Sequence, residues 1–248
     1  MTPAIHAVDF AAIFHRLLEA FGPRGWWPLS ELRRRDPFTG GYHPGDYSPP
    51  ASAAQRFEIG VGAILTQNTT WKQVAGCLDN LEQAGLMSLH ELLRAPVETI
   101  EAAIRASGYY RQKARKLLEF ARFFSEWDPQ PPPRPKLLSV WGVGEETADS
   151  ILLYAYGQPF FVVDAYSRRL VERLTGEVVS KYARLQERIS AAFAHLEYAC
   201  RVQVFNEFHA LVVDLAKNHC CSRPRCRGCP LEDLCLIGKA GGVGTARF

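Results

Sequence analysis

The chain has 248 residues, of which 47% are hydrophobic and 22% charged, and its formal net charge is +3. A chain of this size and composition can bury one large core or two smaller ones. No apolar run approaches the roughly 20 residues that a membrane-spanning helix needs, so we expect no membrane partner. The small positive charge permits nucleic-acid binding without demanding it. The N-terminal segment lacks the pattern of a secretion signal, so we expect a cytoplasmic protein.

Helical periodicity dominates the sequence. Apolar residues recur at helical spacing over residues 10–21, with Asp9 placed to cap that helix and Gly22 to end it. A loop rich in Gly, Pro and aromatic residues follows, to about residue 50. Further helices are predicted throughout residues 53–124 and at 147–156, 165–175, 181–195 and 202–217. The predicted fold class is all-α.

Four cysteines crowd into one short segment near the C-terminal end. They are Cys220, Cys226, Cys229 and Cys235, separated by five, two and five residues. The segment is polar and rich in Arg and Pro, so it can bury little apolar area and must be ordered by a covalent or coordinative link. Crowded cysteines without a secretion signal favour metal ligation over disulfides. Four-thiolate zinc sites usually show two separate C-x2-C pairs, whereas iron–sulfur clusters accept such compact runs, which favours a [4Fe–4S] cluster.

A glycine turn leads directly into a predicted helix at Gly142-Val143-Gly144. Two glycines allow the backbone to turn sharply, and the N–H groups at the start of the next helix form an anion site. A DNA phosphate fits such a site, and contacts of this kind fix position on the duplex without reading its sequence. Taken alone, the same pattern also describes a simple tight turn.

Five sequence segments then follow one another in an order that is typical of one protein family. They are the loops Leu65–Thr69 and Ser107–Ala114, the glycine turn, the segment Val162-Val163-Asp164, and the cysteine run. In this order they resemble the helix-hairpin-helix (HhH-GPD) DNA glycosylase superfamily, in its endonuclease III branch with an iron–sulfur loop. The resemblance spans about residues 53–235.

The resemblance implies a two-lobed helical fold. One lobe would be a six-helix barrel over residues 53–160 that contains the helix-hairpin-helix at 137–150. Residues 1–52 and 161–248 would form the other lobe, with the cluster loop at 220–235. The implied partner is double-stranded DNA that carries a damaged base, bound by a monomer associated with the nucleoid, with a monovalent cation at the hairpin.

The chain departs from this family pattern at two places. Asp164 matches the catalytic aspartate, but Glu146 stands where bifunctional members carry the lysine that forms a Schiff base. A carboxylate cannot form an imine with a sugar aldehyde, so we expect no lyase step and assign Glu146 to the catalytic site, where it would line the pocket or position water. The first cysteine spacing is also one residue short. Cys220 disturbs the family spacing least and is taken as the first cluster ligand, with Cys221 as a spare.

The aromatic residues make the chain most similar to the 3-methyladenine DNA glycosylases of the endonuclease III type. An N-alkylated purine is cationic, so an aromatic pocket can hold it by stacking and cation–π attraction of about 0.5–2 kcal/mol per good contact. The candidates for this base pocket are Trp26, Trp27 and Trp71.

The same resemblance suggests which residues meet DNA. Gln67 would fill the hole left by the flipped nucleotide, and Tyr109 or Tyr110 would press between bases of the opposite strand. The other residues expected at the DNA are Asn68, Lys113, Gly142, Val143, Gly144, Arg225 and Arg227.

Two other functions remain open at this point. The first is a bifunctional endonuclease III-like glycosylase and AP lyase that acts on oxidised pyrimidines, with Lys113 or another amine as nucleophile. The second is a non-catalytic, cluster-containing DNA-binding protein in which Asp164 only caps a helix.

Overall fold

The computed structural model describes residues 8–241, and the chain divides into two compact units. The terminal unit consists of residues 8–26 and 159–241, and the central unit of residues 27–158. Across residues 8–241 the regular structure is helical, with no strand, which confirms the predicted all-α class. Within the same residues, none of the helices has the length and apolar character required to cross a bilayer.

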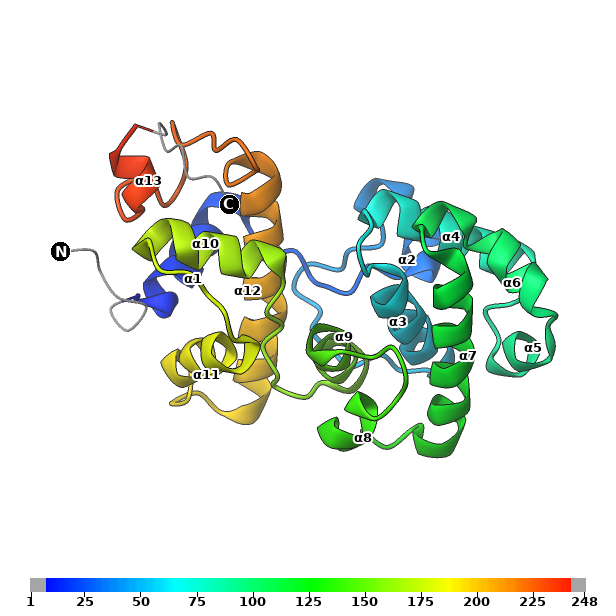
Figure 1. Ribbon diagram of the computed structural model, residues 1–248. Helices are drawn as coiled ribbons and strands as arrows, with labels where there is room; N and C mark the ends of the chain where they lie inside the picture. Colours follow the sequence, from blue (N-terminus) through cyan, green and yellow to red (C-terminus); the bar gives the residue numbers. More distant parts are fainter. Residues whose placement is uncertain (1–7, 242–248) are drawn as a thin grey trace. The chain divides into compact units, whose positions relative to one another are not determined.

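The terminal unit is built around one long helix, α12 (Tyr198–Asn218). Two helices contact it, α1 (Phe10–Phe21) and α10 (Ala165–Thr175), as Figure 1 shows. Helix α11 (Tyr182–Ala192) packs on α1, and the short α13 (Leu236–Lys239) packs on α10. The core of this unit is aromatic and contains Phe14, Phe161, Phe193, Phe205 and Phe208.

The first helix begins and ends where the sequence predicts. The Asp9 carboxylate accepts a hydrogen bond from the Ala12 N–H at 2.9 Å and so caps α1. Gly22 ends the helix with a φ of 71°, a left-handed value that glycine adopts at no steric cost.

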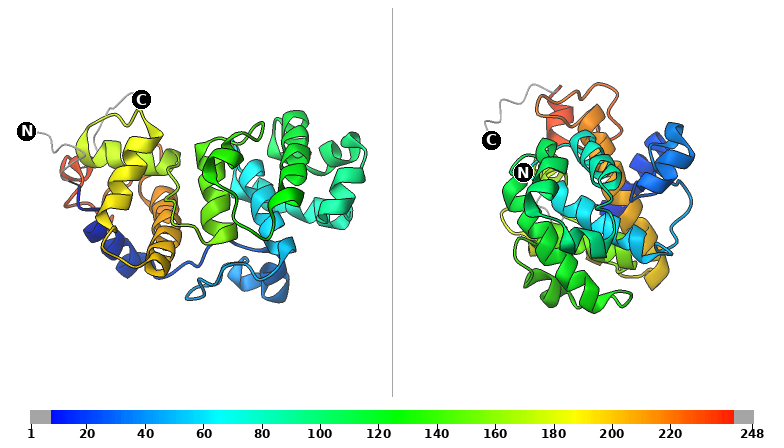
Figure 2. Two further views of the ribbon diagram at one scale, coloured as in Figure 1. Left: turned by 90° about the horizontal axis from the view of Figure 1, so that it is seen from below. Right: turned by 90° about the vertical axis from the view of Figure 1, so that its right-hand side faces the viewer.

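The central unit packs its helices around α3 (Ala53–Leu65), which contacts four other elements. Its remaining elements are α2 (Ser30–Arg35), η2 (Pro37–Thr39), α4 (Trp71–Gln83), α5 (Leu89–Arg94), α6 (Val97–Ala103), η3 (Arg105–Ser107), α7 (Tyr110–Trp127), α8 (Arg134–Leu138), α9 (Glu145–Ser150) and the π-helical turn η4 (Ile151–Ala155). Figure 2 shows the helices of this unit from two further directions. Helices α3 and α7 approach closely, since a Cβ atom on Gly60 would lie 2.1 Å from the Phe120 ring.

Residues 27–52 pack with the central unit, whereas the sequence analysis placed them in the lobe formed by the chain termini. The Ser30 N–H donates to the buried Glu58 carboxylate on α3 at 2.6 Å. Burial raises the pKa of Glu58, and the bond from Ser30 opposes that rise. Trp27 also lies against Gly62 of α3, where a Cβ atom would meet the indole at 3.1 Å. The loop lacks helical periodicity, so its sequence carried no signal of which core it joins.

Candidate active site and cysteine pocket

Asp164 is the N-cap of α10 and is buried in the terminal unit. Its Oδ1 atom accepts two hydrogen bonds from Ser167, one from the backbone N–H and one from the hydroxyl, both at 2.7 Å. The sequence is compatible with a catalytic and with a capping role for this residue. The structure shows that Asp164 does cap the helix, and that the capping bonds occupy one oxygen only.

The other carboxylate oxygen of Asp164 faces His209, which comes from the middle of α12. The His209 Nε2 atom lies 3.5 Å from Asp164 Oδ2. Burial alone would raise the pKa of Asp164, but His209 and the bonds from Ser167 outweigh that effect and hold the pKa below its usual value. Asp164 is therefore a fixed, ionised carboxylate at neutral pH, which can stabilise a neighbouring positive charge.

The loop before Trp26 is held by two other buried polar residues of α12. The Glu207 carboxylate accepts from the N–H groups of Arg24 and Gly25, at 2.8 and 2.6 Å. The side chain of Asn206 accepts from the Trp26 N–H at 3.0 Å and donates to the Trp26 carbonyl. These bonds place the half-buried Trp26 ring edge-on to His209, with centroids 5.3 Å apart and an interplanar angle of 85°.

No sequence motif predicted a role for His209, Asn206 or Glu207. All three lie within an otherwise apolar stretch of α12, where a polar residue that is buried must find a partner. That interruption of the apolar pattern was the available signal, but it does not name the partners, because they come from distant parts of the chain.

The structure brings together two of the three tryptophans expected in the base pocket. In the central unit, the rings of Trp27 and Trp71 are 5.3 Å apart at 85°, and Tyr154 lies 5.2 Å from Trp27. Trp27 is only 6% exposed and acts as a core residue, whereas Trp71 is half-buried at the start of α4. Trp26 belongs to the terminal unit. The base-stacking role of these rings stays a prediction.

The glycine turn forms a hairpin between α8 and α9, and Gln67 is tied to it. Gly142 has a φ of 88°, and the Val143 N–H donates to the Val140 carbonyl at 3.0 Å. The Gln67 amide donates to the Gly142 carbonyl and to the Thr147 hydroxyl, both at 3.0 Å. The Gln67 side chain also accepts from Lys116 of α7. The loop predicted to enter DNA and the hairpin predicted to hold a phosphate are thus one connected structure.

Three further predicted residues, Asn68, Gly144 and Glu146, lie close in sequence to the residues of this network. Asn68, next to Gln67, is exposed and has a φ of 54°. Gly144 is the N-cap of α9, and Glu146 is an exposed residue in the first turn of that helix. The helix N-terminus attracts the Glu146 carboxylate, so this residue is well placed in the helix irrespective of any catalytic role.

The Gly-Tyr-Tyr loop presents one tyrosine to solvent. Tyr109 is 70% exposed and has a φ of 46°. Tyr110 is half-buried and is flanked by the guanidinium groups of Arg105 and Arg111, 5.2 and 5.7 Å from its ring centroid. Tyr109 is therefore the better candidate for insertion between bases.

Lys113 does not reach the surface, which corrects its assignment as a DNA contact. The residue is 2% exposed, and its ammonium group donates to the carbonyls of Leu65 and Ser107 at 2.8 and 2.7 Å. Burial lowers the pKa of Lys113 to about 8. Lys113 thus links the end of α3 to the turn before the Gly-Tyr-Tyr loop. Two loops predicted to meet DNA are held at a fixed spacing by a residue that cannot itself contact DNA.

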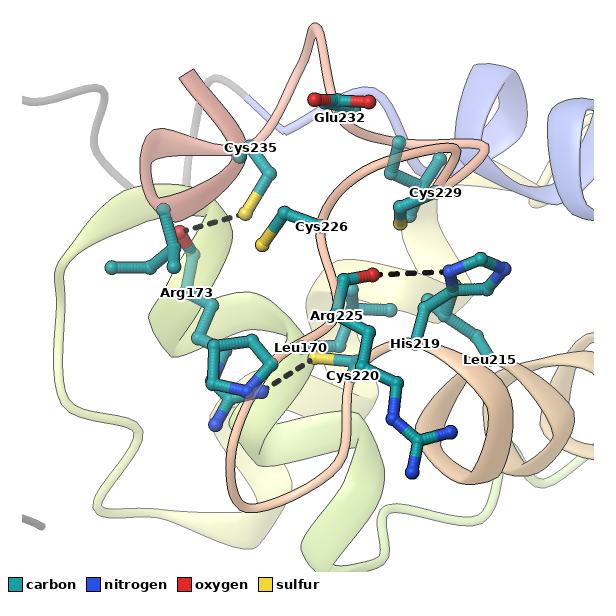
Figure 3. Close-up of a pocket in the computed structure, with 14 residues that line it drawn as sticks. Leu170, Arg173, Leu215, His219, Cys220, Arg225, Cys226, Cys229, Glu232 and Cys235 are labelled. Atoms are coloured by element: carbon teal, nitrogen blue, oxygen red, sulfur yellow. Dashed lines mark hydrogen bonds between the residues drawn. The ribbon is translucent and has the colours of Figure 1, made fainter. Parts of the chain in front are cut away.

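The four cysteines of the predicted cluster loop line one pocket in the terminal unit. Cys220, Cys226, Cys229 and Cys235 line it together with apolar side chains from α10, α12 and the loop, as Figure 3 shows. Cys221 does not line this pocket, and its thiol is directed to the Arg223 carbonyl at 2.8 Å. The arrangement favours Cys220 over Cys221 as the first ligand.

The surroundings of two of these cysteines favour the neutral thiol over the thiolate. Burial raises the pKa of Cys229 to about 11, and it likewise raises the pKa of Cys226, with the neighbouring cysteines adding to both shifts. Such thiols lose their protons readily only when a cation neutralises the sulfur atoms. Four thiols around an apolar space match the donor set of an iron–sulfur cluster. In residues 8–241, no three His, Cys, Asp or Glu side chains form a site for a single metal ion.

Arg173 of α10 joins the cysteine loop to the core of the terminal unit. Its guanidinium donates to the Cys220 sulfur at 3.2 Å and to the carbonyls of Cys221 and Ser222 at 2.7 and 3.0 Å. Within the loop, the Arg225 N–H donates to the His219 carbonyl at 2.8 Å, while the side chains of Arg225 and Arg227 are exposed. These two arginines remain candidates for phosphate contacts.

Comparison with known proteins agrees with this architecture. The family model described as "HhH-GPD superfamily base excision DNA repair protein" matches residues 61–195, more than half of the chain. A Methanocaldococcus jannaschii protein named as a DNA repair glycosylase is 33% identical over 90% of this chain and 94% of its own length.

Two solved structures share the fold. One is an endonuclease III in a non-covalent complex with DNA, with a TM-score of 0.70 and 20% identity over 94% of this chain and 96% of that chain. The other is the Helicobacter pylori 3-methyladenine DNA glycosylase MagIII bound to 1,N6-ethenoadenine, with a TM-score of 0.65 and 23% identity over 85% of this chain and 98% of that chain. From the family model and the relative together, the chain belongs to the HhH-GPD superfamily of base excision DNA repair proteins.

Proposed function

We propose that this protein is a monofunctional DNA glycosylase that hydrolyses the N-glycosidic bond of an alkylated purine in duplex DNA. The observation that carries the proposal is Asp164, a buried carboxylate that is kept ionised by His209 and Ser167. Breaking the glycosidic bond leaves positive charge on the sugar, and a fixed carboxylate stabilises that charge or orients the attacking water.

The preference for alkylated purines follows from charge. An N-alkylated purine already carries a positive charge, so its departure needs little help from a general acid. The half-buried rings of Trp26 and Trp71 offer aromatic surface of the kind that stacks on a cationic base. The MagIII glycosylase, whose structure has a similar fold, is named for 3-methyladenine, which supports the same substrate class.

Two observations argue against a lyase step. The position expected to carry the Schiff-base lysine holds Glu146, and Lys113, the other amine considered, is 2% exposed with two carbonyl partners. An amine must reach the sugar to form an imine, and Lys113 cannot do so from the core.

DNA binding in this proposal uses the connected network of Gln67 and the hairpin. Gln67 would leave its partners at Gly142 and Thr147 to fill the hole when the damaged nucleotide flips out. The hairpin N–H groups would then hold a phosphate, with a monovalent cation alongside. The exposed Tyr109 would insert between bases of the opposite strand.

We further propose that Cys220, Cys226, Cys229 and Cys235 hold a [4Fe–4S] cluster that orders the loop with Arg225 and Arg227 for phosphate contact. The cluster would supply the positive charge that the four thiolates need. Anaerobically purified protein is expected to contain iron and acid-labile sulfide. Cys220→Ser should lower both contents sharply, and Cys221→Ser should leave both unchanged. The reverse result would make Cys221 the ligand.

The test of function is incubation of the purified protein with methylated duplex DNA. Released bases and strand nicks are measured, with and without alkali. Release of 3-methyladenine with nicks only after alkali supports the proposal. Nicks without alkali would contradict the monofunctional assignment, and Lys116→Met would then test the half-buried amine beside Gln67. Absence of base release from methylated, oxidised and mismatched duplexes would contradict catalysis.

A further inference from the structure

We propose that His209 is a positioning residue for Asp164. His209 holds in place the carboxylate oxygen of Asp164 that faces the reacting sugar. The inference rests on the proposed function, because it takes Asp164 as the catalytic carboxylate. It concerns a residue that lies 45 positions further along the chain, in the middle of a different helix, and that no sequence landmark singles out.

The two oxygens of Asp164 have different surroundings. Both hydrogen bonds from Ser167 reach Oδ1, which is the ordinary geometry of a helix cap. The Oδ2 atom takes no part in the cap and faces His209 Nε2 at 3.5 Å. Because Oδ1 is committed to the helix, Oδ2 is the oxygen available to the substrate, and His209 is its neighbour.

The separation of 3.5 Å is longer than a regular hydrogen bond. Catalytic hydrogen bonds are often long without substrate and shorten in the reactive complex. A small movement of the carboxylate toward the imidazole would complete the bond, while Ser167 keeps Oδ1 in place.

The imidazole itself has little freedom to move. His209 is 6% exposed, and its ring lies edge-on to Trp26 at 5.3 Å and to Phe161 at 6.4 Å. Trp26 is in turn fixed by its backbone bonds to Asn206. The ring therefore presents Nε2 to Asp164 from a rigid position, which is the requirement for a residue that positions another.

His209 has a charged neighbour on another element, and a second charged residue lies two positions before it on its own helix. Asp164 faces it from the start of α10, and the neighbouring Glu207 on α12 is occupied by the backbone of Arg24 and Gly25. Trp26 and Phe161 carry no charge in the physiological range. Asp164 is thus the acidic partner that the geometry gives to His209, and a buried polar ring without such a partner would be costly.

The consequence for catalysis concerns both orientation and charge. Burial favours the protonated form of Asp164, and His209 opposes burial more than any other neighbour does. A protonated Asp164 could not stabilise a cationic sugar. Loss of His209 should therefore slow the chemical step. As pH falls, the variant should lose activity at a higher pH than the wild type does, while DNA binding stays unchanged.

The experiment compares wild type with His209→Leu and His209→Gln. Single-turnover release of 3-methyladenine is measured from pH 4.5 to 9, and the Kd for the same duplex is measured separately. The Leu variant is expected to react roughly ten- to a hundredfold more slowly, the usual size of effect when a residue that orients a functional ligand is lost. The acid side of its pH–rate profile should move to higher pH, and its Kd for the duplex should be unchanged. The Gln variant, whose amide N–H lies close to the place of Nε2, should recover most of the rate.

The control is His195→Leu, which changes an exposed histidine of the same unit and should leave rate, pH profile and Kd at wild-type values. If His209→Leu does not fold, as judged by circular dichroism, His209→Asn replaces it, because that side chain is too short to reach Oδ2. A variant with the wild-type rate overturns the inference. Equal losses in the Gln and Leu variants without movement of the acid side of the pH–rate profile overturn it as well, because they indicate a packing role.

The proposed function is decided by the wild-type arm alone. Wild-type protein that releases no base overturns the proposed function, and the inference falls with it. Wild-type protein that releases 3-methyladenine supports the proposed function, and the variants then decide on His209 separately.

Discussion

Asp164 in the terminal unit and Lys113 in the central unit are both buried and ionisable, but their surroundings differ in kind. Asp164 has His209 beside one oxygen and two donors from Ser167 at the other, and its pKa is held below the usual value. Lys113 donates to two neutral carbonyls, and burial lowers its pKa to about 8.

Under the proposed function, this difference separates a chemical role for Asp164 from a structural role for Lys113. The partners of Asp164 preserve its charge in a buried place, which a reaction that generates a cation requires. The partners of Lys113 need only its N–H groups, which remain donors when the amine is neutral. Four measurements on variants of these two residues test whether their roles differ in this way.

The largest effect is expected for Asp164→Asn. An asparagine can still cap α10, but it carries no charge, so we expect base release to fall about a thousandfold, the order seen when one electrostatic group is removed from a transition state. Single-turnover kinetics on methylated duplex measure this. The control is Asp9→Asn, which changes the cap of α1 and should not alter the rate. Full activity of Asp164→Asn would reduce Asp164 to a helix cap.

Lys113→Met should act on stability. The change leaves the carbonyls of Leu65 and Ser107 without their buried donor, so the free energy of unfolding is expected to fall by about 1–3 kcal/mol. Urea denaturation at pH 7 measures this, with the exposed Lys72→Met on α4 as control. If both variants were equally stable, Lys113 would not link the two loops energetically.

The stability difference between wild type and Lys113→Met should grow at alkaline pH. The folded pKa of Lys113, about 8, lies below the unfolded value of about 10.4. Between these values the unfolded chain binds more protons, so wild-type stability rises with pH by this contribution. Urea denaturation at pH 7.5 and pH 10 should show the difference widen by about 1–2 kcal/mol. A constant difference would contradict the burial of a charged amine.

The smallest effect is expected for Asp164 in acid. Its folded pKa is lowered below the unfolded value of about 3.9, so its stabilising contribution is complete above that pH and is lost as pH falls through the folded pKa. The stability difference between wild type and Asp164→Asn should therefore shrink below about pH 4. Thermal unfolding from pH 6 to pH 3 would measure it. A difference that widens in acid would mean that His209 and Ser167 do not overcome burial.

Features set by local sequence could be predicted well. The capping role of Asp164 depends on Ser167, three residues further along, and the pocket is lined by four cysteines that lie close in sequence, Cys220, Cys226, Cys229 and Cys235. Asp9 and Gly22 mark the ends of α1 for the same reason, since caps act over three or four residues.

Features that depend on contacts between distant parts of the chain could not be predicted from the sequence. Lys113 occupies a helical position like any surface lysine, and its burial depends on carbonyl groups 48 and 6 residues away. His209 meets a carboxylate from another helix, and residues 27–52 join the central unit through several contacts with distant residues, such as the bond from Ser30 to Glu58. Pairings of this kind depend on tertiary packing, which periodicity and caps do not encode.

The contact between Glu207 and the backbone of Arg24 also sets an order of events during synthesis, because 183 residues separate the two partners. At about 5–20 residues per second, the ribosome needs roughly 10–40 s to make that stretch. All of residues 27–158 emerge in the meantime and can pack together. During this interval the apolar face of α1, with Phe10, Ile13, Phe14 and Leu17, has yet to meet α12. The nascent chain therefore carries an uncovered hydrophobic helix at residues 10–21 until α12 has been synthesised.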